Sequence, residues 1–342
     1  MKIGIVGYQG SGKSTLFEWL TEIAADPSLS HVTQSAMATV PEPRVAKLCE
    51  IYEPKKITLA AMQLFDTPGL DRSHEGNASR LSLIREAGCL VHVVDAFSGG
   101  DAIEECNSLA EDLLLADMEI VAGRVERLRE SVKKPRPTRA QEEAELAALE
   151  PLLASLEAGT PLTEIEMTEE QHKATRSFQL LTELTRIVIF NVADDETDPE
   201  RFVKEAPEGV KAVAIPIGLA VELARMEEDE RAEMMEELGI GDIDRDTVIR
   251  KILDASGQML FFTAGDKEVR TWMIPQGATA VDAADGIHSD LARGFVRAET
   301  MTCDDLFRLG SEREVKAAKL MRQELKDYVI QDGDILHILS NA

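Results

Sequence analysis

The chain has 342 residues, enough for two or three domains, and its apolar fraction of 44% supplies a hydrophobic core and excludes wholesale disorder. The 63 acidic residues against 37 basic ones give a net charge of −26, which excludes binding of nucleic acid through bulk positive charge. No run of about 18 apolar residues and no secretory leader pattern is found, and the four cysteines are scattered, so we expect a cytoplasmic protein with reduced thiols and no membrane contact.

The first predicted elements are a strand over residues 1–6, a glycine-rich loop and a helix. The loop, residues 7–15, matches the pattern G-x-x-x-x-G-K-[ST], and apolar residues follow it at helical spacing. In such a loop the backbone N–H groups surround phosphates, the lysine reaches the β- and γ-phosphate oxygens, and the hydroxyl binds Mg²⁺. The predicted phosphate-binding residues are Gly10, Ser11, Gly12, Lys13, Ser14 and Thr15.

A second predicted strand, residues 62–65, ends in the sequence Asp-Thr-Pro-Gly, which is typical of a nucleotide switch. We expect Asp66 to hold Mg²⁺ together with Ser14. Gly69 is expected to contact the γ-phosphate through its N–H group, which makes Lys13 and Gly69 the predicted catalytic residues.

The residue after this motif is Leu70, where some GTPases have a glutamine that orients the attacking water. The water must therefore be positioned by the backbone or by a polar residue within 71–77. His74 is the only imidazole in that segment, and a solvated loop residue is the alternative interpretation.

A third buried-type strand, residues 186–190, precedes the segment expected to meet the base. Guanine-specific proteins have Asn-Lys-x-Asp here, and this chain has Asn191, Val192 and Asp194, without the lysine. Asn191 can tie this loop to the phosphate loop, and Asp194 can accept hydrogen bonds from guanine, so the base preference stays open. Alternatively, Asp194 and Asp195 only cap the next helix.

Between the switch and the base loop, apolar residues repeat with heptad spacing on two segments, which predicts an antiparallel coiled-coil hairpin. The seam residues are Leu114, Met118, Val121, Val125, Leu128 and Val132 on the outgoing arm and Leu146, Leu149, Leu153 and Leu156 on the return.

The end of this hairpin is basic, although the whole chain is acidic. Residues 124–139 contain seven Lys or Arg and two Glu, whereas residues 141–170 contain nine Glu and no basic residue. The basic end is the best local footprint for RNA phosphate in the chain, and a solvated helix surface is the alternative interpretation.

From residue 261 onward the pattern predicts a small α+β fold. Strands are expected over 268–274, 328–330 and 335–339, with a helix over 280–291. No catalytic cluster is seen in this region, and we expect it to dock to a partner by shape.

These motifs in this order, together with residues 261–265 and 268–272, resemble the YchF family, the Obg-like ATPases of the translation-factor class. The resemblance implies an α/β fold with three parts and hydrolysis of ATP or GTP coupled to ribosome or RNA binding. The implied parts are a Rossmann-like P-loop nucleotide-binding domain (1–112 and 177–258), an inserted helical hairpin (113–176) and a C-terminal TGS domain with a ubiquitin-like β-grasp fold (259–342).

The chain departs from the family pattern in four places. Members have Asp-Ile-Ala-Gly where residues 66–69 are Asp-Thr-Pro-Gly, and Glu where this chain has Asp194, which shifts the expectation toward guanine. The family's first switch cannot be recognised, so Ser30 and Thr33 are only weak candidates for a further Mg²⁺ ligand. The loop 98–101 lacks the histidine implicated in catalysis in the family.

The sequence thus predicts a monomeric, Mg²⁺-dependent purine nucleoside triphosphatase that acts as a nucleotide switch and binds the ribosome or RNA through the hairpin end and the TGS domain. A nucleotide-gated binding module with negligible hydrolysis is the alternative. A P-loop small-molecule kinase is disfavoured, because a kinase needs no γ-phosphate-sensing motif followed by a base loop.

Overall fold

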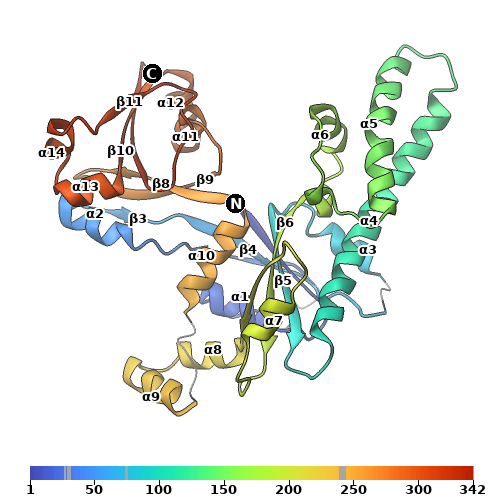
Figure 1. Ribbon diagram of the computed structural model, residues 1–342, viewed down its shortest axis with the longest axis horizontal. Helices are drawn as coiled ribbons and strands as arrows, with labels where there is room; N and C mark the ends of the chain where they lie inside the picture. Colours follow the sequence, from blue (N-terminus) through green and yellow to red (C-terminus); the bar gives the residue numbers. More distant parts are fainter. Residues whose placement is uncertain (27, 29–31, 74–75, 239–243, 342) are drawn as a thin grey trace. The chain divides into compact units, whose positions relative to one another are not determined.

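The structure is a computed structural model, and it describes residues 1–341 except 27, 29–31, 74–75 and 239–243. The chain folds into two compact units, each built around a six-stranded sheet (Figure 1). The first unit comprises Met1–Ala36 and Gln63–Arg245, and the second comprises Met37–Met62 and Asp246–Ala342.

The sheet of the first unit has the strand order β2-β4-β1-β5-β6-β7, and its pairs from β4 to β7 are parallel. Parallel strands are buried on both faces, and β5 and β6 accordingly bury most of their side chains. Because parallel neighbours end at one edge, the loops that follow β1, β4 and β6 meet there. The strands are β1 (Lys2–Val6), β2 (Gln34–Thr39), β4 (Ala61–Asp66), β5 (Cys89–Ala96), β6 (Thr185–Val192) and β7 (Lys211–Ile215).

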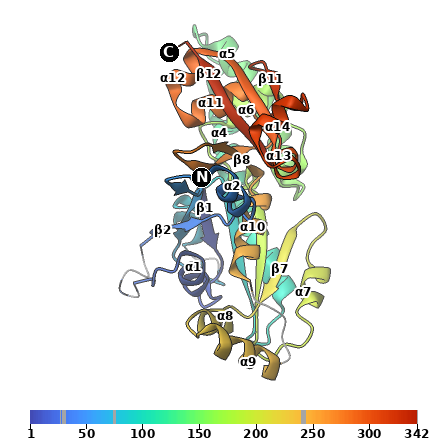
Figure 2. The ribbon, with the colours of Figure 1, turned by 90° about the vertical axis from the view of Figure 1, so that its left-hand side faces the viewer.

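Helices cover both faces of this sheet, which confirms the expected α/β class. On one face Val94 and Phe190 pack against Ala102 of α4 and Phe202 of α7, whereas α1 packs against α8. Figure 2 shows α1 and α7 on opposite sides of the strands. The helices are α1 (Lys13–Thr21), α3 (Asn77–Ser82), α4 (Ala102–Ser131), α5 (Arg139–Glu157), α6 (Glu169–Thr175), α7 (Glu200–Glu205), α8 (Ile217–Ala224) and α9 (Glu228–Leu238).

The expected antiparallel hairpin is confirmed as α4 and α5, which lie side by side in the first unit (Figure 1). Val121, Val125 and Leu128 of α4 are buried against Leu149 and other leucines of α5. Helix α4 has 30 residues, so it begins well before the seam that the sequence revealed. It starts at an N-cap, Asp101, whose carboxylate accepts hydrogen bonds from two backbone N–H groups of the first turn.

The second unit has the strand order β11-β10-β12-β8-β9-β3, and two hydrophobic clusters pack its helices against the sheet, one with residues of α2 and α13 and the other with residues of α11. The strand expected over residues 328–330 is wrong. These residues lie in a loop, where Val329 forms an isolated bridge with Thr279. Strand β11 pairs with β10 instead. The elements are α2 (Arg44–Tyr52), β3 (Ile57–Thr58), α10 (Arg245–Ala255), β8 (Gln258–Ala264), β9 (Val269–Pro275), α11 (Ala280–Ile287), α12 (Ser289–Arg293), β10 (Phe295–Thr302), α13 (Cys303–Leu309), α14 (Glu312–Ala317), β11 (Arg322–Glu324) and β12 (Asp334–Ser340).

Within the described residues, none of the helices combines the length and the apolar character that crossing a membrane requires.

Candidate nucleotide-binding site

The phosphate loop joins the end of β1 to the start of α1 at the carboxyl edge of the first sheet. Gly12 precedes α1 with φ of 101°, a left-handed conformation that glycine adopts without strain. A Cβ at Gly12 would also lie 2.5 Å from the Asn191 amide nitrogen. Both the backbone conformation and the space at this position therefore require glycine.

Lys13 lies inside the loop with only 6% of its surface exposed. Its Nζ donates a hydrogen bond to the Tyr8 carbonyl oxygen at 2.7 Å. Burial lowers the pKa of Lys13 to about 8, although the negative charges of Asp66 and Glu105 act in the opposite direction. A phosphate oxygen in place of the carbonyl would give this buried ammonium a full counter-charge.

The Ser14 hydroxyl donates a hydrogen bond to the Asp66 carboxylate at 2.7 Å, so the two predicted metal ligands lie side by side. The other carboxylate oxygen, Oδ1, is buried and has no hydrogen-bond partner among the described residues. Burial raises the pKa of Asp66, and the Ser14 hydrogen bond and the Lys13 charge reduce that rise. A hydroxyl and a carboxylate are ligands of the kind that Mg²⁺ takes beside nucleotide phosphates, so these residues fit the ion.

Ser30 and Thr33 were the weaker candidates for a further metal ligand. Ser30 lies outside the described residues, and the Thr33 hydroxyl is buried without a hydrogen-bond partner in the described part of the chain. Among the described residues, no group of three or more His, Cys, Asp or Glu is arranged to hold a metal ion. The role of Thr33 therefore stays a prediction.

The switch segment pairs directly with the phosphate loop. Leu70 N–H donates to the Gly7 oxygen at 3.0 Å, and Gln9 N–H donates to the Leu70 oxygen at 2.9 Å. A Cβ at Gly69 would lie 2.8 Å from the Gln9 Cα and 3.1 Å from Lys13 Nζ. Gly69 thus lies against the same lysine that is predicted to reach the γ-phosphate.

Leu70 itself is 3% exposed and packs in a hydrophobic cluster with Val6 and Tyr8. An apolar side chain in this position provides no hydrogen bond to orient water. His74, the imidazole considered for that task, lies outside the described residues.

Asn191, at the end of β6, connects three segments of the site. Its amide nitrogen donates to the Ser11 oxygen at 3.1 Å, and its amide oxygen accepts from the Ile217 N–H at 3.0 Å. The asparagine therefore ties the base loop to the phosphate loop, as the sequence suggested, and it also holds the start of α8.

The rest of the base loop is less constrained. Asp194 is exposed, and a Cβ at Gly218 would lie 3.8 Å from its Oδ1. The next helix, α7, has Pro199 as its N-cap and no side-chain cap, so Asp194 and Asp195 do not cap it. Val192 is 3% exposed and packs with core residues, so its contact with a base stays a prediction.

The remaining loop residues differ in exposure. Ser11 is fully buried, and its hydroxyl has no partner among the described residues, whereas Thr15 is half-buried on the first turn of α1. A Cβ at Gly10 would have no neighbour within 4 Å, which leaves the outer side of the loop open.

Sequence reasoning did not single out Arg72, which lies beside the loop. Its Nη1 donates to the Gln9 carbonyl oxygen at 3.0 Å, its Nη2 forms an ion pair with Glu105 of α4 at 2.7 Å, and its guanidinium lies 5.6 Å from the centre of the Tyr8 ring. These partners are 33 to 64 positions away in the chain, so local sequence patterns give no signal for them.

A second missed group links the site to α4. The Tyr8 hydroxyl donates to Asp112 at 3.0 Å, and the Asn77 amide donates to the same carboxylate oxygen at 3.0 Å. Burial raises the pKa of Tyr8 to about 12, so the hydroxyl stays protonated and able to donate. One carboxylate of the hairpin helix thus contacts both the phosphate loop and the helix that comes after the switch.

The basic hairpin end is largely neutralised by ion pairs. Four of its seven cations pair with glutamates: Arg124 with Glu145, Arg129 with Glu150, Lys133 with Glu130 and Arg139 with Glu143. Arg127, Lys134 and Arg136 are exposed and have no carboxylate partner within 4.0 Å in the described chain.

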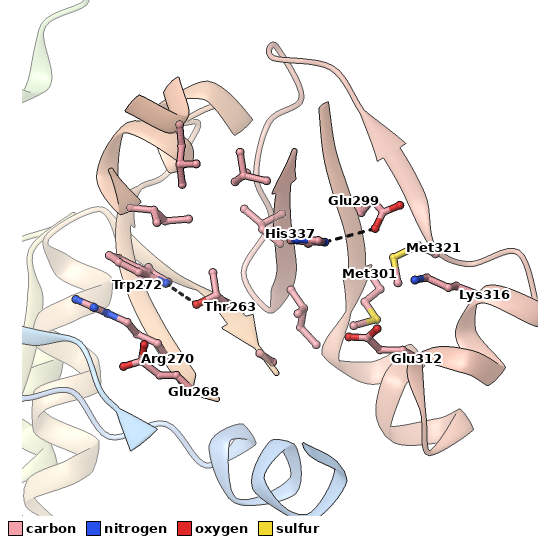
Figure 3. Close-up of a pocket in the computed structure, with 16 residues that line it drawn as sticks. Thr263, Glu268, Arg270, Trp272, Glu299, Met301, Glu312, Lys316, Met321 and His337 are labelled. Carbon is pink, nitrogen blue, oxygen red and sulfur yellow. Dashed lines mark hydrogen bonds and ion pairs between the residues drawn. The ribbon is translucent and has the colours of Figure 1, made fainter. Parts of the chain in front are cut away.

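The second unit has a groove of about 590 Å³ over its sheet. Figure 3 shows Trp272 and Thr263 on one side and His337 and Glu299 on the other. The Arg270 guanidinium lies 3.9 Å from the centre of a Trp272 ring, and the indole N–H donates to Thr263 at 3.0 Å. The groove contains none of the predicted nucleotide-site residues.

A glycine loop with a buried lysine, closed by a switch segment at the carboxyl edge of a parallel sheet, defines a P-loop nucleotide-binding protein. Family models agree: residues 2–124 match the 50S ribosome-binding GTPase model, and residues 259–341 match YchF-GTPase_C, described as a protein of unknown function (DUF933). The chain belongs to the YchF family, as the resemblance in its sequence indicated.

Three relatives illustrate the match. The chain is 34% identical over 364 residues to the ribosome-binding ATPase YchF of Bacillus subtilis, with 99% of each chain covered. It is 34% identical over 371 residues to Obg-like ATPase 1 of Oryza sativa, covering 100% of this chain and 92% of the relative. The solved YchF GTPase of Schizosaccharomyces pombe superimposes with a TM-score of 0.82 at 26% identity, covering 99% and 97% of the two chains.

Proposed function

We propose that the protein is a Mg²⁺-dependent purine nucleoside triphosphatase that changes conformation with its nucleotide and engages the ribosome as a monomer. The observation that carries the proposal is the pairing of the switch with the phosphate loop, which places Gly69 against Lys13. A terminal phosphate bound at Lys13 therefore meets the switch backbone directly, and its loss on hydrolysis releases that contact.

Each residue of the site has a separate role in this proposal. Lys13 neutralises charge on the γ-phosphate, the backbone N–H groups of residues 10–15 surround the phosphates, and the Gly69 N–H contacts the γ-phosphate. Ser14 and Asp66 would hold Mg²⁺, which would supply positive charge beside the phosphates.

We propose that both purines bind. Asp194 is an exposed carboxylate able to accept hydrogen bonds from guanine N1 and N2, whereas the lysine that would cover the base is replaced by the buried Val192. The site thus keeps one element of guanine recognition and lacks another, so discrimination between ATP and GTP is expected to be small.

We propose the ribosome as a partner because the names of the relatives describe ribosome-binding ATPases. Arg127, Lys134 and Arg136 at the hairpin end are exposed cations that suit RNA phosphate. The groove of the second unit offers a further surface for the same partner.

One observation favours a second candidate, a nucleotide-gated binding module with negligible hydrolysis. Leu70 is buried and apolar at the position where some GTPases orient the attacking water. Such a module would bind and release its partner by nucleotide exchange alone.

Phosphate release from ATP and from GTP, measured with Mg²⁺ or with EDTA and with or without ribosomes, tests the proposal. We expect Mg²⁺-dependent release that Asp66→Asn lowers about 10- to 100-fold, while the exposed Asp198→Asn behaves as the wild type. Equal release in EDTA would contradict the role of Mg²⁺. Tight nucleotide binding without release, even with ribosomes, would favour the binding module.

A further inference from the structure

The side chain of Arg72 lies along the outer edge of the phosphate loop. Its Nη1 donates to the carbonyl oxygen of Gln9 at 3.0 Å, and its guanidinium lies 5.6 Å from the centre of the Tyr8 ring. Two carboxylates of the first unit hold the other side of the guanidinium, Glu105 at 2.7 Å and Asp95 at 3.7 Å. The cation is therefore fixed in position although about half of its surface is exposed.

The carbonyl that Arg72 binds belongs to a residue beside the predicted γ-phosphate position. Gln9 and the Lys13 ammonium are both neighbours of Gly69, because a Cβ at Gly69 would lie 2.8 Å from Gln9 Cα and 3.1 Å from Lys13 Nζ. The positive charge of Arg72 is also close enough to contribute to the lowered pKa of Lys13. The guanidinium thus lies at the terminal-phosphate end of the loop.

Hydrolysis at this site would be helped by a second positively charged side chain beside the γ-phosphate. Hydrolysis spreads negative charge over the γ-phosphate oxygens, and Lys13 is the only cation that the sequence motifs supply there, beside Mg²⁺. Leu70 contributes no polar group. A planar guanidinium binds two phosphate oxygens at once, and the single neutral carbonyl of Gln9 is a weaker acceptor than a charged phosphate oxygen.

We propose that Arg72 is a catalytic residue of this site: it exchanges the Gln9 carbonyl for the γ-phosphate oxygens and stabilises the transition state with an arginine supplied by the chain itself. The inference rests on the proposed triphosphatase function. Water oxygen forms a bond to the γ-phosphorus as the bond from phosphorus to the β–γ bridging oxygen breaks. The bridging oxygen keeps the electron pair, one proton of the water passes to an oxygen of the released phosphate and the other stays on the attacking oxygen, and Arg72 forms no covalent bond.

The competing role is structural, with Arg72 serving only to clamp the switch segment to α4 through Glu105. The two roles predict different results when the ion pair is broken from the side of the glutamate. Glu105→Gln removes the charge that holds the guanidinium but keeps an oxygen able to accept from the Asp95 N–H, which now donates to Glu105 at 2.9 Å. A clamp is lost in this variant, whereas a catalytic arginine is kept.

Single-turnover hydrolysis and nucleotide affinity of the full chain, measured for Arg72→Ala, Arg72→Lys and Glu105→Gln, distinguish the roles. We expect Arg72→Ala to slow hydrolysis about 10³-fold with triphosphate affinity changed less than about 3-fold, since the contact forms in the transition state. Arg72→Lys should recover only part of the rate, because the planar fork is missing. Glu105→Gln should hydrolyse at the wild-type rate or faster. Equal slowing in Arg72→Ala and Glu105→Gln, or no slowing in Arg72→Ala, overturns the proposal.

A binding measurement distinguishes a failure of the Arg72 proposal from a failure of the proposed triphosphatase function. Aluminium fluoride with the nucleoside diphosphate mimics the transferring phosphoryl group, so calorimetry should show that fluoride tightens diphosphate binding in the wild type and not in Arg72→Ala. If the wild type shows this Arg72-dependent tightening but no turnover, the triphosphatase function fails and the Arg72 contact stands. If the wild type shows no tightening, or Arg72→Ala tightens equally, the assignment of Arg72 is overturned whatever the turnover.

Discussion

The phosphate loop and the hairpin end both carry positive charge in the first unit, but their cations differ in burial and in pairing. In the loop, one buried cation, Lys13, is held by a backbone carbonyl, the oxygen of Tyr8. At the hairpin end, seven cations are spread over the ends of α4 and α5 and the turn between them, and four of them are paired with glutamates. A motif fixed by backbone geometry therefore specifies which cation is buried, whereas a count of charges does not tell which cations are paired.

The largest effect expected for either of these two regions is that of Lys13→Ala on triphosphate affinity. Losing a charge-assisted contact to phosphate in a buried site should cost about 3 kcal/mol, a weakening of roughly 100-fold. The fold should persist, because the ammonium makes no ion pair that the core needs. Calorimetric titration with ATP and GTP checks this, with exposed Lys204→Ala on α7 as the control. Unchanged affinity in Lys13→Ala would remove the basis for the site.

A smaller effect is expected in the difference in folding stability between Gly12→Ala and its matched control, Gly10→Ala. Both glycines have positive φ, 101° and 88°, so both substitutions carry a backbone strain of about 1–2 kcal/mol. Only Gly12→Ala adds a contact with Asn191, at 2.5 Å. Chemical denaturation should therefore show Gly12→Ala to be less stable by about a further 1–3 kcal/mol. Equal destabilisation would mean that Asn191 moves aside freely.

Asp194→Ala is expected to have an intermediate effect on nucleotide affinity, because Asp194 belongs to the predicted site but its side chain is exposed. Losing its hydrogen bonds to guanine should weaken GTP about 10-fold and ATP less than about 2-fold. Competition of the two nucleotides for a fluorescent analogue measures both affinities, and the exposed neighbour in Asp195→Ala serves as the control. An equal loss for both nucleotides would show that Asp194 does not read the base.

The smallest effect is expected at the hairpin end. Replacing Arg127, Lys134 and Arg136 with Gln should flatten the salt dependence of ribosome binding by about 0.7 to 0.9 in log–log slope for each RNA phosphate that the variant no longer neutralises. The paired cations Arg124, Arg129 and Arg139 form the matched control set, and their replacement should leave the slope unchanged. Cosedimentation with ribosomes at two salt concentrations checks this. Equal slopes in all proteins would exclude the three unpaired cations as RNA contacts.

Much of the fold and of the phosphate site could be predicted from the sequence, because both are encoded locally. Three patterns are short enough for the local sequence to predict their structure: the loop of residues 7–15, the switch motif and the hairpin seam. What escaped prediction depends on tertiary contacts: Arg72 meets Glu105 only because α4 packs beside the switch, and Arg124 meets Glu145 only through the register of two helices. The strand expected over 328–330 did not form for a related reason: a short apolar run also suits a loop, in which Ile330 is buried while Val329 is exposed.

Helix α4 runs without interruption from its N-cap near the sheet to the hairpin end, so a tilt at one end displaces the other end. Asp112, which accepts hydrogen bonds from Tyr8 and Asn77, lies 19 residues before the last residue of the helix, Ser131, or about 28 Å at 1.5 Å per residue. A tilt of about 5° at Asp112 displaces Ser131 by about 2.5 Å. A small shift of the phosphate loop that tilts the helix at Asp112 would therefore be magnified at the far end of the helix, where the partner is expected.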